Sequence, residues 1–254
     1  MQAIAVIPSR YGSTRLPAKA LLRDTGKYLV QHVYERAAQA KRLSRVVVAT
    51  DDQRIVDAVR SFGGEVVMTR PDHQSGTDRV AEVAEQLGGG QDALYLNVQG
   101  DEPEVSPLAL DRLVERMAGE RADCPMGTLA CRFPPHLDAT APSTVKVVIS
   151  DTGRALYFSR SLIPYPRDGG ESAPGWGPLL HLGVYAYRRP FLLQLATWPP
   201  GTLEQIEKLE QLRVLQRGHP IAVEIVEHAS VGIDTPRDYE QFVARWRQRT
   251  GSGC

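Results

Sequence analysis

Apolar and polar positions in the first half of the chain follow two alternating patterns. Short, continuous apolar runs are typical of buried strands, and stretches with apolar residues three or four positions apart are typical of helices. Strands are predicted at 3–7, 45–49, 65–68 and 93–98, and helices follow Asp52, Ser75 and Ser106, ending near glycines 63, 88 and 119. Strands that alternate with helices at this spacing predict a parallel sheet with helices on both faces.

The second half has a different pattern, because strands follow one another with loops between them. Strands are predicted at 126–132, 145–150, 155–158, 182–187 and 221–226. This order favours a mixed or antiparallel extension of the sheet. The loop at 164–180 is rich in glycine and proline, and long loops of this kind are often functional.

Two helices are predicted in this half. One opens at a capping box, Thr202–Gln205, and runs to Leu215, with Ile206, Leu209 and either Leu212 or Arg213 on its core face. The last helix follows Pro236 and points Tyr239, Phe242, Val243 and Trp246 inward. Together the two halves predict an α/β fold: a Rossmann-like, mostly parallel sheet with a smaller mixed-sheet lobe.

The length of 254 residues suits one domain at 1–250, with a first half at about 1–120, further elements at about 121–235 and a disordered tail at 251–254. The formal net charge of +0 gives no global field for nucleic acid or membrane, and no apolar run approaches the roughly 20 residues of a membrane helix. The three cysteines, Cys124, Cys131 and Cys254, form no C-x-x-C pair, and the first strand leaves no room for a signal peptide. We therefore expect a cytoplasmic protein.

The loop after the first strand carries the strongest functional signal. From Met1 to Arg23 there is no acidic residue, while Arg10, Arg15 and Lys19 are cationic and flank the small residues 12–14, Ser13 among them. Small residues let a backbone approach a ligand, and uncompensated cations attract polyanions, so the loop favours a triphosphate cradle. It matches neither a Walker A loop nor a G-x-G-x-x-G fingerprint. A solvated basic loop is the alternative.

Two carboxylates predict a metal site. Asp101 directly follows a strand, and Asp234 stands far away in Gly232–Pro236. Ligands of open α/β sheets bind beyond the carboxyl ends of strands, and Mg²⁺ on a nucleotide takes one or two carboxylates plus phosphates. Asp234 alone could simply cap the last helix, but Thr235 can do so in its place. Glu102 competes with Asp101 and is expected to point away.

These stretches together resemble the 3-deoxy-manno-octulosonate (Kdo) cytidylyltransferase family, also called CMP-Kdo synthetases, and they run from end to end in that family's order. The matching stretches are 7–17, 49–51, 72–79 (DHQSGTDR), 97–103 (NVQGDEP), 155–160, 181–185, 207–213 and 232–236. Two departures are Tyr28, where proline is expected, and Ser9, where alanine is commoner.

The resemblance implies that CTP and Kdo give CMP-Kdo and pyrophosphate on a fold of the nucleotide-diphospho-sugar transferase type, in a homodimer that serves lipopolysaccharide synthesis. Arg10, Arg15 and Lys19 would hold the β- and γ-phosphates, and Asp101 and Asp234 would hold Mg²⁺. The nucleotide would meet Ser13, Ser75, Gly76 and Gln99. The sugar would meet Arg160, Arg167, His181, Tyr185, Glu210 and Gln211.

The residues assigned to the sugar also have ordinary structural interpretations. Arg160 would then be a surface charge, His181 a hydrogen-bonded core histidine, and Glu210 a solvated partner of Arg213. Two rival functions remain open: a cytidylyltransferase for sialic acid or for an 8-amino analogue of Kdo, and a nucleotide-binding domain without activity. The intact set of cationic and acidic residues argues against the second.

Overall fold

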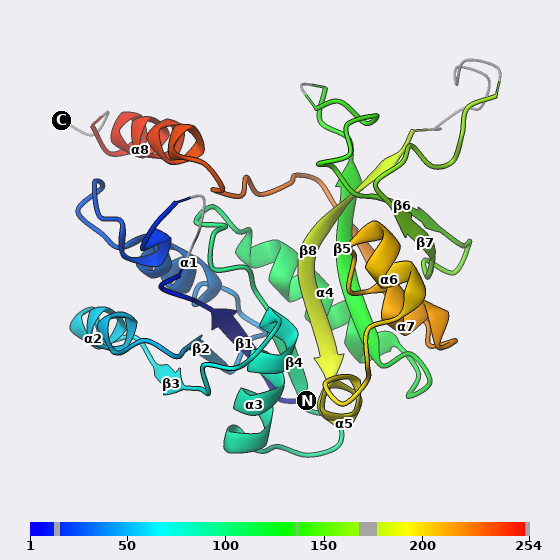
Figure 1. Ribbon diagram of the computed structural model, residues 1–254, viewed down its shortest axis with the longest axis horizontal. Coiled ribbons are helices and arrows are strands. Elements are labelled where there is room, and N and C mark those ends of the chain that lie inside the picture. Colours follow the sequence, from blue (N-terminus) through cyan, green and yellow to red (C-terminus); the bar gives the residue numbers. More distant parts are fainter. Residues whose placement is uncertain (13–15, 136, 168–176, 252–254) are drawn as a thin grey trace. The chain divides into compact units, whose positions relative to one another are not determined.

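The computed structural model in Figure 1 describes residues 1–12, 16–135, 137–167 and 177–251. Its chain divides into two units, and each is described by itself. The first unit comprises Met1–Asp111 and Ser230–Cys254, and the second comprises Arg112–Ala229. The division falls inside helix α4 (Pro107–Gly119). Whether the chain acts as one domain stays a prediction.

The sheet of the first unit is parallel, as predicted. Strand β1 (Ala3–Pro8) pairs in parallel with β2 (Arg45–Thr50) on one side and β4 (Leu94–Asn97) on the other, and β2 pairs with β3 (Val66–Met68). β1 and β4 are almost wholly buried, which explains their continuous apolar runs. The strands lie in the order β3-β2-β1-β4. The chain adds β2 and β3 on one side of β1 and then returns to add β4 on the other side, so the direction of strand addition reverses between β1 and β4.

Helices cover both faces of this sheet. Helices α1 (Leu29–Ala37) and α2 (Gln53–Ser61) lie on one face in Figure 1, and α3 (Gly76–Leu87) lies on the other. Right-handed crossovers require this change of face where the strand order reverses. Helix α1 was not predicted from the sequence, although Leu29, Val30, Val33 and Ala37 are buried at helical spacing.

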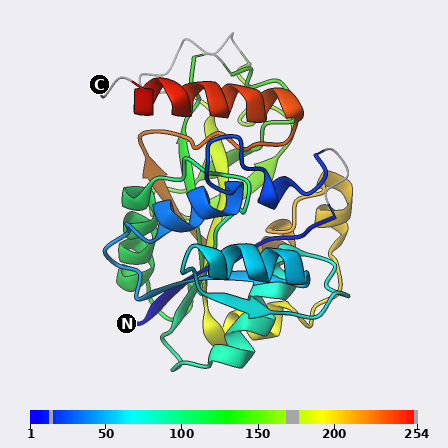
Figure 2. The ribbon, with the colours of Figure 1, turned by 90° about the vertical axis from the view of Figure 1, so that its left-hand side faces the viewer.

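The C-terminal part of the first unit packs against the loop between β1 and α1. Helix α8 (Pro236–Gly251) contributes Tyr239, Phe242 and Val243 to a buried cluster with Leu16, Leu29 and Ile233. Figure 2 shows α8, in red, on the same side of the unit as the blue α1. Thr235 caps α8 as predicted, since its Oγ1 accepts a hydrogen bond from the Asp238 amide at 3.2 Å. The helix includes Gly251, which we had expected to begin the disordered tail; residues 252–254 lie outside the described residues.

The second unit contains the predicted mixed sheet. Strand β5 (Met126–Arg132) pairs antiparallel with β8 (Leu179–Arg188) and parallel with β9 (Ile221–Val226). Strand β6 (Lys146–Ile149) pairs antiparallel with both β7 (Ala155–Ser159) and β8. Helix α5 (Arg189–Leu195) follows β8 directly and was not predicted. The α/β class with a mixed second half is therefore confirmed.

The helix predicted from Thr202 to Leu215 is wrong as one continuous element. It consists of α6 (Thr202–Glu207) and α7 (Leu212–Gln216), because Lys208 adopts a left-handed conformation with φ 54°. Gly201, not Thr202, is the N-cap, and its amide donates to Glu204 Oε2 at 2.9 Å. The break turns Ile206 out to 72% exposure, whereas Leu209 and Leu212 are buried as predicted.

Two further expectations concern the long loop and membrane helices. Most of the loop at 164–180 falls on residues 168–176, which lie outside the described residues. Among the helices of the described residues, none is long and apolar enough to cross a membrane.

Candidate functional site

A small pocket of about 110 Å³ opens where β1 and β4 end side by side. This is the point at which the strand order of the first unit reverses, and open α/β sheets place ligands there. The predicted residues Arg10, Lys19, Gln99 and Asp101 line the pocket together with Ser9 and Gly100. The structure thus brings together predicted residues from two stretches that are far apart in the sequence.

Lys19 lies at the centre of a charged cluster beside this pocket. Its Nζ is 2.7 Å from Asp101 Oδ2 and 3.5 Å from Asp234 Oδ1, and it donates to the Ile233 carbonyl at 2.8 Å. The Ile233 amide in turn donates to the Asp101 carbonyl at 2.9 Å, so the loop carrying Asp234 is fastened to the loop carrying Asp101. The two acidic positions singled out in the sequence therefore face one cation.

The backbone before Lys19 fixes the position of this ammonium group. Lys19 begins a short 3₁₀ helix, Lys19–Leu21, and the residue before it, Ala18, has φ 52°. An alanine in the left-handed region is disfavoured relative to glycine, so surrounding contacts must hold it there. Leu16 is buried in the cluster with α8, which anchors the preceding segment.

The donor set at this cluster fits a divalent cation that arrives with phosphates. The carboxylates of Asp101 and Asp234 are 28% and 49% exposed, and both lie within ion-pair distance of the same ammonium. The Lys19 ammonium therefore compensates both carboxylates in this structure. Among the described residues, no group of three or more His, Cys, Asp or Glu side chains could hold a metal ion. Mg²⁺ commonly binds in proteins through one or two carboxylates plus substrate phosphates, which is the arrangement available here.

Glu102 does not join the carboxylate pair. Its side chain accepts a hydrogen bond from Ser230 Oγ, and burial raises its pKa to about 7, with the nearby charge of Asp101 adding to the shift. The adjacent residues Asp101 and Glu102 therefore have different partners: Asp101 contacts Lys19, and Glu102 contacts Ser230.

The other predicted nucleotide residues surround the start of α3. Arg10 Nη2 donates to the His73 carbonyl at 2.8 Å, and His73 is itself hydrogen-bonded to Glu82. Ser75 caps α3: its Oγ accepts from the Asp78 amide at 3.1 Å, while its own amide donates to Asp78 Oδ2 at 3.0 Å. Gly76 is the first residue of α3, beside Pro8 and Asn97. Ser13 and Arg15 lie outside the described residues.

An ion pair that the sequence analysis did not identify supports this region. Arg79 is fully buried, and its Nη2 is 3.2 Å from Asp51 Oδ2. Its Nη1 donates to Thr69 Oγ1. Arg79 thereby ties α3 to the ends of β2 and β3. Both Asp51 and Arg79 stood in stretches that carried the family resemblance, and a charged pair at such positions was the available signal.

Four of the residues predicted to bind the sugar come together in the second unit. His181 and Tyr185, both on β8, have ring centroids 5.5 Å apart. Tyr185 Oη donates to Gln211 Oε1 at 3.1 Å, and burial raises the pKa of this tyrosine, with the charge of Glu210 adding to the shift. Gln211 is 3% exposed, and its Nε2 has no hydrogen-bond partner among the described residues.

His181 is uncharged at neutral pH. Burial lowers its pKa to about 3, and its Nε2 lies 3.1 Å from Thr128 Oγ1. Its ring also packs edge-on against Phe158. The histidine thus contributes hydrogen bonds and shape rather than positive charge.

Arg160 directly follows β7 and links three neighbouring segments by hydrogen bonds. Its guanidinium donates to three carbonyl groups, at 2.8 Å to Glu207, 2.8 Å to Pro142 and 3.4 Å to Lys208. The sequence analysis did not identify its neighbour Lys146, a fully buried lysine whose Nζ donates to the carbonyl of Arg160 and, at 2.7 Å, to that of Thr144. Arg167 is exposed and lies next to the undescribed residues 168–176.

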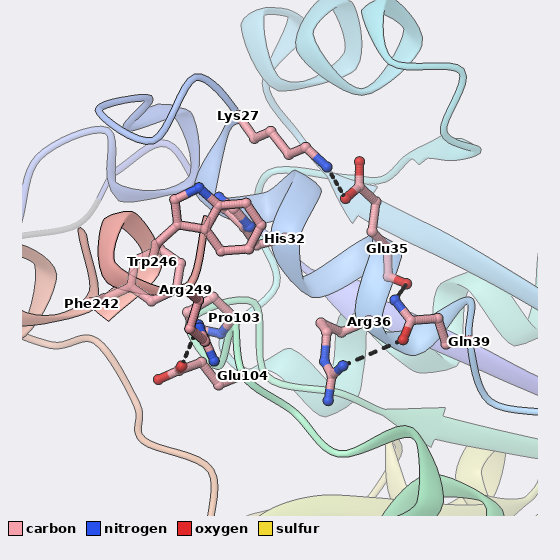
Figure 3. Close-up of a pocket in the computed structure, with 10 residues that line it drawn as sticks. All are labelled: Lys27, His32, Glu35, Arg36, Gln39, Pro103, Glu104, Phe242, Trp246 and Arg249. Atoms are coloured by element: carbon pink, nitrogen blue, oxygen red, sulfur yellow. Dashed lines mark hydrogen bonds and ion pairs between the residues drawn. The ribbon is translucent and has the colours of Figure 1, made fainter. Parts of the chain in front are cut away.

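A larger pocket of about 370 Å³ lies elsewhere in the first unit and contains none of the predicted residues. Figure 3 shows Lys27 pointing to Glu35 and Arg249 pointing to Glu104, with His32 and Trp246 between these pairs. The two ion pairs measure 2.6 and 2.8 Å. Its two carboxylates pair with Lys27 and Arg249, and its third cation, Arg36, donates to the Val105 carbonyl and to Gln39, so each cation of this pocket already has a protein partner.

Comparison with known proteins gives matches over nearly the whole chain. The cytidylyltransferase family model matches residues 4–225. A 3-deoxy-manno-octulosonate cytidylyltransferase from Geobacter sulfurreducens is 48% identical over 252 residues, covering 96% of this chain and 99% of the relative.

Solved structures agree with the fold. The structure of CMP:2-keto-3-deoxy-manno-octonic acid synthetase complexed with CTP matches with a TM-score of 0.91 at 44% identity, covering 98% of this chain and 100% of that one. 4-Diphosphocytidyl-2C-methyl-D-erythritol synthase shares the fold alone, with a TM-score of 0.63 at 15% identity over 96% of this chain and 97% of that one.

Proposed function

Because this chain belongs to the 3-deoxy-manno-octulosonate cytidylyltransferase family, we propose that it transfers the cytidylyl group of CTP to Kdo and releases pyrophosphate. Membership confirms the resemblance inferred from the eight matching stretches that run from residue 7 to residue 236. The observation that carries the proposal is 48% identity over 96% of the chain to a relative of that name. In this reaction the anomeric oxygen of the sugar bonds to the α-phosphorus as the bond from that phosphorus to pyrophosphate breaks.

The pocket between the ends of β1 and β4 would hold the nucleotide. Arg10 and Lys19 both line it and carry the positive charge that the phosphates need, and Arg15 would add to them. Positioning and charge neutralisation supply most of the catalysis in reactions of this type. The nucleoside would contact Gln99, which also lines the pocket, and Ser75 and Gly76 at the start of α3. Ser13, in the loop after β1, would also contact the nucleotide.

Asp101 and Asp234 would hold Mg²⁺. When bound, the ion would offset phosphate charge at the reacting centre. Lys19 now neutralises these carboxylates at 2.7 and 3.5 Å, and its flexible side chain can turn to phosphate oxygens when another cation takes over that role. Lys19 would thus keep the acidic pair compensated in the free enzyme and contact the triphosphate in the loaded one.

The polar cluster of the second unit would recognise the sugar acid. Neutral His181, the Tyr185–Gln211 pair and Glu210 offer hydrogen bonds to hydroxyl groups, and Gln211 Nε2 donates to no partner within the part of the chain that the structure describes. Arg160 uses three of its donors on carbonyl groups, and a guanidinium has five. The remaining N–H groups of the Arg160 guanidinium and the exposed Arg167 would bind the carboxylate of the sugar acid.

We further propose a cytoplasmic homodimer that serves lipopolysaccharide synthesis. Cys124 and Cys131 are buried and free, which fits a reducing compartment. The second unit exposes Leu156 at 62% and Ile206 at 72%, which contact with a second copy of the chain would cover. Light scattering on the purified protein measures the oligomeric state.

A pyrophosphate-release assay with CTP and Mg²⁺ tests the activity against Kdo, its 8-amino analogue, sialic acid and a neutral hexose. We expect efficient release with Kdo and strong rejection of the hexose, because a site built for a carboxylate leaves its arginines unpaired with a neutral sugar. Preference for sialic acid or the amino analogue would change the substrate and keep the cytidylyltransferase. No release with any acceptor would contradict the proposed activity.

A further inference from the structure

Two polar atoms near the nucleotide pocket are buried without a partner. Ser9 and Asn97 are each 4% exposed. Among the described residues, neither Ser9 Oγ nor Asn97 Oδ1 has a hydrogen-bond partner. Buried polar groups are nearly always paired in folded proteins, so two exceptions at neighbouring strand ends require an explanation.

The backbone holds the Ser9 hydroxyl beside the pocket. The Ser9 amide donates to the Ala49 carbonyl at 2.9 Å, which extends the pairing of β1 with β2 by one residue. On the other side, a Cβ at Gly100 would stand 2.7 Å from the Pro8 carbonyl oxygen and 3.0 Å from Ser9 Oγ. Glycine at this position therefore allows the two loops to meet and leaves the hydroxyl next to a residue that lines the pocket.

We infer that the Ser9 hydroxyl is a hydrogen-bonding contact for the bound cytidine nucleotide. This inference rests on the proposed function, since it assigns a further binding residue in the same pocket. The hydroxyl can donate to a phosphate or ribose oxygen and can accept from a ribose hydroxyl. Asn97 Oδ1 can accept but not donate, so its partner must be a donor, and the nucleoside carries such groups whereas ionised phosphates do not. Ser9 also departs from the residue expected in the family, and such a contact gives the departure a role.

The inference predicts opposite effects on stability and on binding. Ser9→Ala removes a hydroxyl that has no partner among the described residues, so it should leave thermal stability unchanged or higher. The same variant should bind CTP about three- to tenfold more weakly in calorimetric titration, the effect of losing one neutral hydrogen bond. Ser44→Ala is the matched control. Ser44 Oγ donates to the Ala3 carbonyl at 2.9 Å, so that variant should lose stability and keep its CTP affinity.

Titrations with CTP, CMP and 2′-deoxy-CTP distinguish the atoms involved. A Ser9→Ala loss for CTP that CMP does not show assigns the contact to the outer phosphates, and a loss for both that 2′-deoxy-CTP does not show assigns it to the ribose 2′-hydroxyl. Ser9→Cys, which fills similar space with a weak donor, should also bind CTP more weakly and serves if the alanine variant folds poorly. Wild-type CTP affinity in the alanine or cysteine variant would overturn the inference. Absence of CTP binding by the wild-type protein would instead overturn the proposed function.

Discussion

The polar clusters of the two units are built on different physical terms. In the first unit, Lys19, Asp101 and Asp234 are charged and partly exposed, and one ammonium serves two carboxylates. In the second, His181 and Gln211 are buried and uncharged and make specific hydrogen bonds. Partly exposed ion pairs are weak and exchange partners readily, whereas buried hydrogen bonds tolerate no loss of a partner. The first cluster therefore suits a site that binds and releases a polyanion, and the second suits a site of fixed shape.

The largest expected effect tests the carboxylate pair. Asp101→Asn and Asp234→Asn should each lower turnover by about 10³-fold, the scale on which charge stabilisation acts in active sites, while the fold remains intact. Steady-state pyrophosphate release and circular dichroism measure the two properties. Asp57→Asn is the control, because that exposed carboxylate on α2 contacts Gln53. Near wild-type turnover in either site variant at saturating Mg²⁺ would remove that residue from the site.

The buried cluster should respond to acid. His181 has a pKa of about 3 when folded, against 6.5 for an ordinary histidine, so the unfolded chain takes up the proton first. Its contribution to stability is complete above pH 6.5 and is lost as the pH falls toward 3. Between pH 6.5 and 4 the loss should approach about 3 kcal/mol, measured by urea unfolding at each pH.

Two variants isolate the histidine responsible. His181→Gln should reduce the decline of stability with falling pH and leave the part due to His32, whose pKa burial lowers to about 4. His228→Gln, at an exposed position of the same unit, should retain the full decline. An unchanged pH dependence in the His181 variant would show that this imidazole is not buried in its neutral form.

The shared ammonium makes a prediction of opposite sign for metal and for nucleotide. Lys19→Met frees Asp101 and Asp234 from their cation, so Mn²⁺ should bind to the nucleotide-free protein about tenfold more tightly, as followed by electron paramagnetic resonance. The same variant should bind CTP more weakly. Lys27→Met, which breaks the pair with Glu35 elsewhere in the first unit, should change neither. Weaker Mn²⁺ binding in the Lys19 variant would contradict competition for the carboxylates.

A smaller effect is expected in the second unit. Tyr185→Phe removes the hydrogen bond to Gln211 Oε1 and leaves an amide whose Nε2 has no partner in the described chain. The KM for Kdo should rise about fivefold, while the KM for CTP stays unchanged. Tyr157→Phe on β7 should change neither KM. A rise confined to CTP would place this cluster at the nucleotide instead.

The sequence predicted much of the fold because its local signals were strong. The helix that follows Ser75 and the Thr235 cap were predicted, and β9 was predicted with its observed bounds, since apolar periodicity and capping chemistry depend on neighbouring residues. The predicted helix at 202–215 failed because the left-handed Lys208 carries no sequence signal of its own; glycine usually occupies that conformation. An ion pair of 2.6 Å between Glu204 and Arg213 accompanies the break and depends on the folded chain.

The sequence named residues that the structure brings together beside one pocket, Arg10, Lys19, Gln99 and Asp101, but not how the charged ones pair. Asp101 and Asp234 were expected to face one another across a metal ion, and Lys19 was assigned to phosphates. That Lys19 contacts both carboxylates follows from the path of the chain through Ala18 and Ile233, which no spacing rule specifies. The ion pair of Arg79 with Asp51 joins residues of neighbouring elements; both residues stood in family-matching stretches, but those stretches do not specify that the two side chains contact each other.

The smallest expected effect compares the backbone next to each cluster. Among the described non-glycine residues, Ala18 and Lys208 have positive φ, 52° and 54°, and each lies next to a polar cluster. A left-handed side-chain residue is disfavoured by roughly 1–2 kcal/mol, and glycine recovers most of this while losing some chain entropy. Ala18→Gly and Lys208→Gly should therefore each raise the free energy of unfolding by about 0.5–1 kcal/mol, as measured by urea titration. Ala38→Gly, at φ −67°, should lower it. A loss of stability in Ala18→Gly would show that the alanine methyl makes contacts that outweigh the backbone strain, and the position of Lys19 would then depend on side-chain packing.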